Sequence, residues 1–124
     1  MGFNAWSGWL FPDPDTNSRP PPSTYRGRMI RHTVAFRLHH EPGSVEEQEF
    51  LAAARTLADV PGVQAFELLR QTSAKNPFTF GLSMEFADEA AYAGYDAHPA
   101  HRAFVAERWL PEVADFLEID YTPL

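Results

Sequence analysis

The sequence predicts an α+β fold of the ferredoxin-like type, a sandwich with the element order β-α-β-β-α-β. Two apolar patterns carry this prediction across residues 29–124. One alternates every second residue, as in half-buried strands, and the other has the three-and-four spacing of amphipathic helices. Proline and glycine separate the patterned segments. The order implies a four-stranded antiparallel sheet that carries its helices on one face.

The first strand is expected over residues 30–38, where apolar residues alternate with more polar ones. A helix follows, because Ser44 and Glu47 have the spacing of a capping box. The Pro-Gly pair at 61–62 marks its end. The second strand is then expected over residues 63–70, so the first half of the chain supplies a strand, a helix and a strand.

The third strand is expected over residues 78–86, with large apolar side chains on one face. Asp88 is placed to cap the second helix. That helix cannot run smoothly through His98, because the residue before a proline is driven out of the helical conformation. Pro99 suits the first turn of a new helix. Residues 115–124 then close the chain as the last strand.

The face of the sheet turned away from the helices is predicted to have mixed polarity. Its expected members are Thr79, Gly81, Ser83 and Glu85 on the third strand and Phe66 and Leu68 on the second. Such a face suits contact between two sheets better than full exposure to water. We therefore expect a homodimer.

Residues 1–28 differ from the rest of the chain and are interpreted as a Pro-rich leader. They hold five of the eleven prolines and lack a periodic apolar segment. This composition favours an extended or disordered segment. Trp6 and Trp9 are unusual in a linker, so docking on the domain or on a partner subunit is the alternative. The expected organisation is this leader followed by one domain over residues 29–124.

The overall charge limits the partners. The chain has 17 acidic and 10 basic residues, a net charge of −7, which disfavours nucleic acid and anionic membranes. The absence of cysteine excludes disulfides and thiolate chemistry. No apolar run is long enough to span a bilayer, and no secretory signal pattern is visible. A cytoplasmic protein without nucleic-acid or membrane partners is expected.

Five segments carry a resemblance to a known family: RHTVAFRL, VPGV, FGLSMEFAD, YDAHPAHRAFV and FLEIDYTPL. Over residues 29–124 they resemble the Dabb family, the stress-responsive A/B barrel domains. The resemblance implies a ferredoxin-like protomer that pairs sheet to sheet into a dimeric α+β barrel. It also implies a cavity between the helices and the sheet of each protomer.

The resemblance extends to a plant polyketide cyclase of this family, which closes a linear polyketide into an aromatic acid. In that enzyme the tyrosine and the second histidine of a similar motif act at the reacting carbonyls. These positions fall on Tyr95 and His101 here, and a histidine of its first strand falls on His32. A further histidine of its third strand is replaced by Phe80, which thins the polar lining and argues against the same substrate.

The chemistry of these residue types fits such roles. Histidine titrates near neutral pH and can take a proton from a carbon beside a carbonyl, so His101 is the candidate general base. A phenol can donate to a developing oxyanion, which makes Tyr95 the candidate donor. The structural alternatives are a buried His101 hydrogen-bonded to the backbone or to a carboxylate such as Asp120, and a Tyr95 ring that only packs beneath its helix.

Five further residues are candidates for the wall of a substrate pocket: His32, Phe80, His98, Phe104 and Trp109. Aromatic walls with a few inward polar groups are typical of small-molecule pockets. His98 has a structural alternative, because it stands directly before a proline and can serve the helix start. The spacing of the histidines dictates no metal site, and neither a metal nor a cofactor is expected.

Two functions of different classes remain open. In the first, the protein takes a small hydrophobic or aromatic carbonyl compound and acts on it as a cofactor-independent cyclase, isomerase or lyase, through Tyr95 and His101. In the second, it is a non-catalytic, stress-linked binding or structural dimer with a small or filled pocket. Retention of Tyr95 and His101 favours the first function, and Phe80 in place of a polar residue favours the second.

Overall fold

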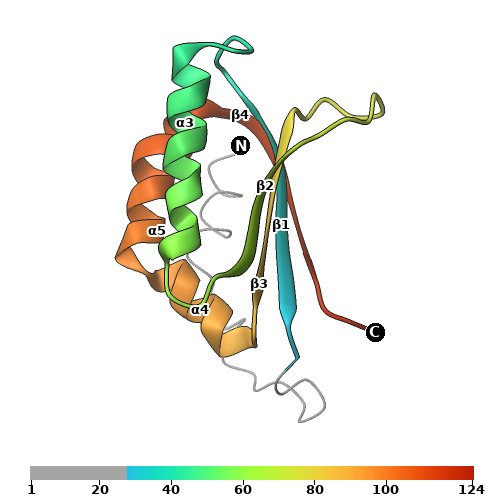
Figure 1. The fold of residues 1–124 in the computed structure, drawn as a ribbon, viewed down its shortest axis with the longest axis vertical. Coiled ribbons are helices and arrows are strands. Elements are labelled where there is room, and N and C mark those ends of the chain that lie inside the picture. The colour runs from blue at the N-terminus through green and yellow to red at the C-terminus, as the bar shows by residue number, and fades with distance from the viewer. Residues whose placement is uncertain (1–27) are drawn as a thin grey trace.

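The computed structural model of the chain describes residues 28–124, which form a sheet with helices packed against it (Figure 1). The predictions made for the leader, including docking of Trp6 and Trp9, lie outside the described residues. Among residues 28–124, no helix combines the length and the apolar composition needed to cross a membrane.

The described strands form one antiparallel sheet in the order β2-β3-β1-β4. This is the order expected when two strand-helix-strand units interleave, and it confirms the predicted α+β fold. The helices cover one face of the sheet (Figure 1). The strands are β1 (Ile30–Leu38), β2 (Gln64–Arg70), β3 (Phe80–Phe86) and β4 (Val113–Tyr121).

The helical layer consists of two segments, one before and one after the β2–β3 hairpin. The first is α3 (Val45–Arg55) with the short 3₁₀ helix η2 (Thr56–Asp59). The second is broken into α4 (Glu89–Ala97), α5 (Pro99–Phe104), the π-helical turn η3 (Val105–Trp109) and the short α6 (Leu110–Glu112).

The predicted capping box starts α3. The Ser44 hydroxyl accepts a hydrogen bond from the backbone N–H of Glu47 at 3.1 Å. The Glu47 carboxylate returns a bond to Gly43 N–H at 2.9 Å, one residue earlier than in the standard box. At the other end Gly62 turns the chain into β2 with a φ of +93°, a conformation that favours glycine.

The break between α4 and α5 is formed as the sequence predicts. Asp88 caps α4 by accepting from Ala91 N–H at 2.9 Å. His98 leaves the helical conformation with ψ 135°, and Pro99 takes the first position of α5. The Nδ1 atom of His98 accepts from Ala100 N–H at 3.1 Å, so this ring caps the new helix.

The π-helical turn changes which residue of this segment faces the sheet. Regular helical spacing predicts that Arg108 continues the apolar face of His101, Phe104 and Val105, and that prediction is wrong. The wider turn brings Trp109 onto that face, where it is 1% exposed. Arg108 instead pairs with Glu112 one turn later at 2.9 Å.

A core of aromatic and aliphatic side chains fills the space between the helices and the sheet. Phe36 lies at its centre, with ring contacts to Phe50, Phe80 and Trp109 at 5.1–5.8 Å between centroids. Aromatic pairs at such distances add to the stabilisation from area burial. Phe66 and Leu68 pack against this core, so their expected place on the opposite face is wrong. The irregular pairing early in β2 shifts the alternation of this strand by one residue.

The opposite face of the sheet carries exposed apolar side chains. They are Leu69 of β2 and Leu117, Ile119 and Tyr121 of β4, each more than 40% exposed. Across the strands they adjoin the small residues Ala35 and Gly81. No helix of the described residues covers this face (Figure 1).

Candidate functional site

A small cavity lies between the helical layer and the sheet. Its volume, counted as the space open to the centres of water-sized molecules, is about 10 Å³. That is room for about one water molecule. The wall consists of His32, Val34, Leu57, Leu82, Tyr95, His101, Phe104, Val105 and Trp109. Three polar rings therefore share one otherwise apolar cavity.

His101 comes from the first turns of α5 and is 2% exposed. Its Nδ1 atom lies 3.1 Å from the backbone carbonyl oxygen of Asp96, which can only accept a hydrogen bond. Nδ1 therefore carries the proton of the neutral ring, and Nε2 is the acceptor. Burial lowers the pKa of His101 to about 4, so the ring is neutral at physiological pH.

Tyr95 reaches the same cavity from the last turn of α4. Its ring lies 4.4 Å from the ring of His101, centroid to centroid, and 5.1 Å from that of Phe86. Burial raises its pKa above the ordinary value of a phenol, with a smaller contribution from the negative charge of Asp96. The hydroxyl consequently keeps its proton and remains a hydrogen-bond donor.

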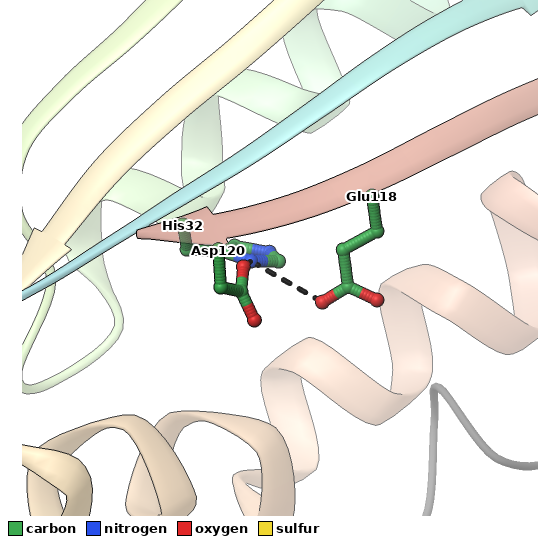
Figure 2. Close-up of side chains that lie close together, drawn as sticks. All are labelled: His32, Glu118 and Asp120. Carbon is green, nitrogen blue, oxygen red and sulfur yellow. Dashed lines mark hydrogen bonds and ion pairs between the residues drawn. The ribbon is translucent and has the colours of Figure 1, made fainter. Parts of the chain in front are cut away.

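His32 lines the cavity from β1 and belongs at the same time to a polar cluster at the edge of the helical layer. Its Nδ1 atom lies 2.7 Å from Asp120 Oδ1 and 3.4 Å from Glu118 Oε2 (Figure 2). The Tyr92 hydroxyl lies within 3.0 Å of His32 Nδ1, Glu118 Oε2 and Asp120 Oδ2. We call His32, Tyr92, Glu118 and Asp120 the carboxylate cluster.

Crowding of acidic groups changes the titration of this cluster. Burial, followed by the charge of Asp120, raises the pKa of Glu118 to about 7. Burial also raises the pKa of nearby Asp96 to about 6. The pKa of Tyr92 is raised as well, by burial and then by Glu118 and Asp120. Close to neutral pH the cluster therefore holds a proton that ordinary carboxyl groups would release.

The candidate residues from the sequence divide into two groups. His32, Tyr95, His101, Phe104 and Trp109 line the cavity together. Phe80 and His98 do not. Phe80 stands at the opposite end of β3 from Phe86, whose ring contacts the cavity residue Tyr95. Phe80 therefore packs on Phe36, further along the sheet. His98 turns to the start of α5 as its cap.

Sequence reasoning missed most of the carboxylate cluster. It considered Asp120 only as a partner for His101, whereas Asp120 bonds to His32. It gave no role to Tyr92 or Glu118. One signal was available, since Phe116, Glu118 and Asp120 alternate on β4 and must share a face. What was lacking was the register that places Asp120 directly opposite His32.

The spacing of donor atoms in the cluster also suits a cation. Donor atoms of His32, Glu118 and Asp120 lie within 4.8 Å of one another. The hydrogen bonds among these side chains, however, account for their arrangement without a cation. The loop histidine His40 pairs instead with Glu112 at 2.7 Å.

The fold and the cavity together define a class of protein: a ferredoxin-like α+β domain with a mostly apolar cavity between helices and sheet that holds three polar rings. The family model of the stress responsive A/B barrel domain, Dabb, matches residues 30–123. The chain belongs to the Dabb family, as the sequence motifs indicate. A search of the curated proteins gave no match.

Solved structures agree with this assignment. A Dabb family protein of Mesorhizobium loti is 57% identical and matches 78% of this chain and 98% of its own, with a TM-score of 0.77. An Arabidopsis thaliana protein is 27% identical over 77% of this chain and 95% of its own, with a TM-score of 0.65. A dimeric ferredoxin-like protein of unknown function from Thermobifida fusca is 22% identical over 85% and 100%, with a TM-score of 0.66.

Proposed function

We propose that this protein moves a proton on a small carbonyl compound held in the cavity, without a cofactor. The observation that carries the proposal is the convergence of Tyr95, His101 and His32 on one cavity. Polar groups that meet in an apolar cavity, with strongly shifted pKa values, are typical of functional sites. The plant polyketide cyclase that the motif resembles is olivetolic acid cyclase. This resemblance supports the roles of Tyr95 as hydrogen-bond donor and His101 as base.

The reaction follows from the protonation states. Nε2 of neutral His101 takes a proton from the carbon next to the carbonyl, and the C–H bonding pair moves toward the carbonyl oxygen. The Tyr95 hydroxyl donates to that oxygen as its negative charge develops. The enolate formed can then be protonated elsewhere or attack a second carbonyl, so isomerase, lyase and cyclase reactions share this first step.

The size of the cavity limits the substrate. Space for about one water molecule excludes an aromatic compound from the cavity in its described shape. Short ketones and aldehydes are the compounds to test first, because they require the smallest displacement of Phe104 and Trp109. A larger substrate requires movement of α5 or of the π-helical turn.

The protein is also proposed to act as a homodimer through the free face of its sheet. The exposed side chains Leu69, Leu117, Ile119 and Tyr121 lie there beside small residues that allow close approach of a second sheet. Face-to-face packing of two sheets buries such side chains. The dimeric relative from Thermobifida fusca has the same fold.

The small cavity favours a second function, that of a non-catalytic dimer. A chain whose cavity holds about one water gains most of its stability from a filled core and needs no ligand. Under this alternative Tyr95 and His101 are core residues, and the dimer serves as a structural or binding unit.

Exchange of carbon-bound hydrogen distinguishes the two functions. Acetone and butanone are incubated with the protein in D₂O, and loss of the α-hydrogen signal is followed by NMR. The natural chain is expected to accelerate exchange, and His101→Ala and Tyr95→Phe to slow it by about 10²-fold or more, the usual contribution of such groups. His98→Asn is the control, because asparagine also caps helices and His98 lies outside the cavity wall. Equal rates with and without protein would leave the non-catalytic dimer.

A further inference from the structure

The carboxylate cluster joins the cavity to the protein surface. His32 lies in the cavity wall and is 2% exposed. The side chains of Glu118 and Asp120, which contact its ring, are 21% and 34% exposed. Figure 2 shows both carboxylates on β4 turned toward the ring of His32. A proton that reaches this ring therefore has a short path to solvent.

One distribution of protons satisfies the contacts that Asp120 and Glu118 make with His32 and Tyr92 at less than 3.0 Å. Asp120, as a carboxylate, accepts from His32 Nδ1 at 2.7 Å and from the Tyr92 hydroxyl at 2.8 Å. The Tyr92 hydroxyl has one hydrogen, and with that hydrogen on Asp120 the 2.9 Å contact between Tyr92 and Glu118 Oε2 requires the proton of a neutral Glu118. Asp120 is then the one anion of the cluster, and the raised pKa of Glu118 agrees with this distribution. Nε2 is left as the acceptor nitrogen of His32.

The two cavity histidines are thus held by different groups. His101 donates to a backbone carbonyl, which is neutral. His32 donates to a carboxylate, whose negative charge lies 2.7 Å from the ring. A proton transfer that removes hydrogen at one atom and returns it at another can use two such groups, one for each atom. The cavity contains one histidine of each kind.

We infer that His32 is a second proton carrier of the cavity and that Asp120 is its positioning residue. The inference rests on the proposed function for the reaction, but the tautomer it assigns to His32 does not. In the reaction, His32 Nε2 takes a proton from the substrate as a C–H or O–H bond breaks, and Asp120 balances the charge. The proton returns to the product or leaves from Nδ1 through Asp120. Reactions that relocate a hydrogen, such as keto–enol isomerisation, fit this pair best.

The tautomer of His32 is measured directly by ¹⁵N–¹H NMR of the histidine rings in the natural chain. The expected signal at neutral pH is a proton on Nδ1. Asp120→Ala should abolish this preference, because it removes the acceptor that lies 2.7 Å from Nδ1. Asp120→Asn should keep the tautomer, since its amide oxygen still accepts, but it removes the charge. Glu118→Gln should also keep the tautomer, because Asp120 remains at 2.7 Å. Asp115→Ala and Asp115→Asn are the matched controls, because they make the same changes on β4 at a residue that bonds the neighbouring Phe116 N–H.

Two results would overturn the inference: a proton on Nε2 in the natural chain, or an unchanged tautomer in Asp120→Ala. The ketone exchange assay tests the catalytic part separately. There Asp120→Asn should slow exchange by about 10²-fold, and Asp115→Asn should leave it unchanged. Exchange that persists at the natural rate in Asp120→Asn refutes the second carrier but leaves His101 in place. Absence of exchange in every chain refutes the proposed function, whatever the tautomer.

Discussion

Replacing His101 by glutamine tests how the cavity controls the charge of its histidine. The ring is buried, and its pKa falls from the ordinary 6.5 to about 4. Groups that face it are the Asp96 carbonyl, which opposes this fall, and His32, Arg102 and His98, whose positive charges reinforce it. Glutamine has no charge to gain, so the variant removes one titration from folding.

The direction in which stability changes with pH follows from proton binding. Between pH 6.5 and pH 4 the unfolded chain protonates His101 and the folded chain does not, so stability is lost as the pH falls through this window. Each pH unit is worth about 1.4 kcal/mol. From the two pKa values the total loss is about 3 kcal/mol, complete near pH 4. Asp96 and Glu118 have raised pKa values, so their protonation adds stability as the pH falls and opposes the effect of His101. The effect of His101 is therefore obtained as the difference between the natural chain and the variant.

Urea denaturation of both proteins at pH 7, 6, 5 and 4 gives the difference in unfolding free energy. The protein concentration is held fixed, because a dimer gains stability with concentration. Relative to pH 7, the natural chain should lose about 3 kcal/mol more than His101→Gln by pH 4. His98→Asn should behave like the natural chain. A difference that does not change with pH would refute the argument that His101 is buried as a neutral base.

Stability and assembly give three more tests. Trp109→Ala should lower the free energy of unfolding by about 3–5 kcal/mol, since Trp109 is 1% exposed, whereas Val45→Ala at 65% exposure should change it little. Glu118→Gln should raise the melting temperature at pH 8 but not at pH 4. Burial and Asp120 raise the carboxyl pKa from 4.5 to about 7, so the natural chain loses stability as the pH rises between these values, and the loss is complete at pH 8; equal changes at both pH values would contradict this. Leu117→Lys should give a monomer in sedimentation where Val45→Lys leaves a dimer.

The elements of the fold were predictable because each has a local cause. Alternation identifies β1, the capping box starts α3, and the Pro99 ring ends α4 whatever lies around it. The π-helical turn has no such local signal. It is selected by the fit of the Trp109 indole against Phe36 and Phe116, which come from β1 and β4. Only packing between distant segments decides it.

The site was predictable only in part, because some of its contacts join segments that are far apart in the sequence. The motif in α4 and α5 placed Tyr95 and His101 together through nearby residues. The partner of His32 is 88 positions away. A shift of one residue in the pairing of β1 with β4 would send Asp120 to the other face of the sheet. No pattern within either strand fixes that register, so the carboxylate cluster appears only once the strands are paired.

The junction at His98 and Pro99 explains why Tyr95 and His101 line one cavity at all. In a continuous helix, residues six positions apart point about 120° away from each other around the axis. Their rings would then line different surfaces. Here the chain leaves the helical conformation at His98 and restarts at Pro99, and the two rings meet at 4.4 Å. The same break frees the carbonyl of Asp96 near the end of α4 to accept from His101 Nδ1, which fixes the tautomer of the ring. The helix break therefore sets both the position and the protonation of the proposed base, and its two residues do so without lining the cavity themselves.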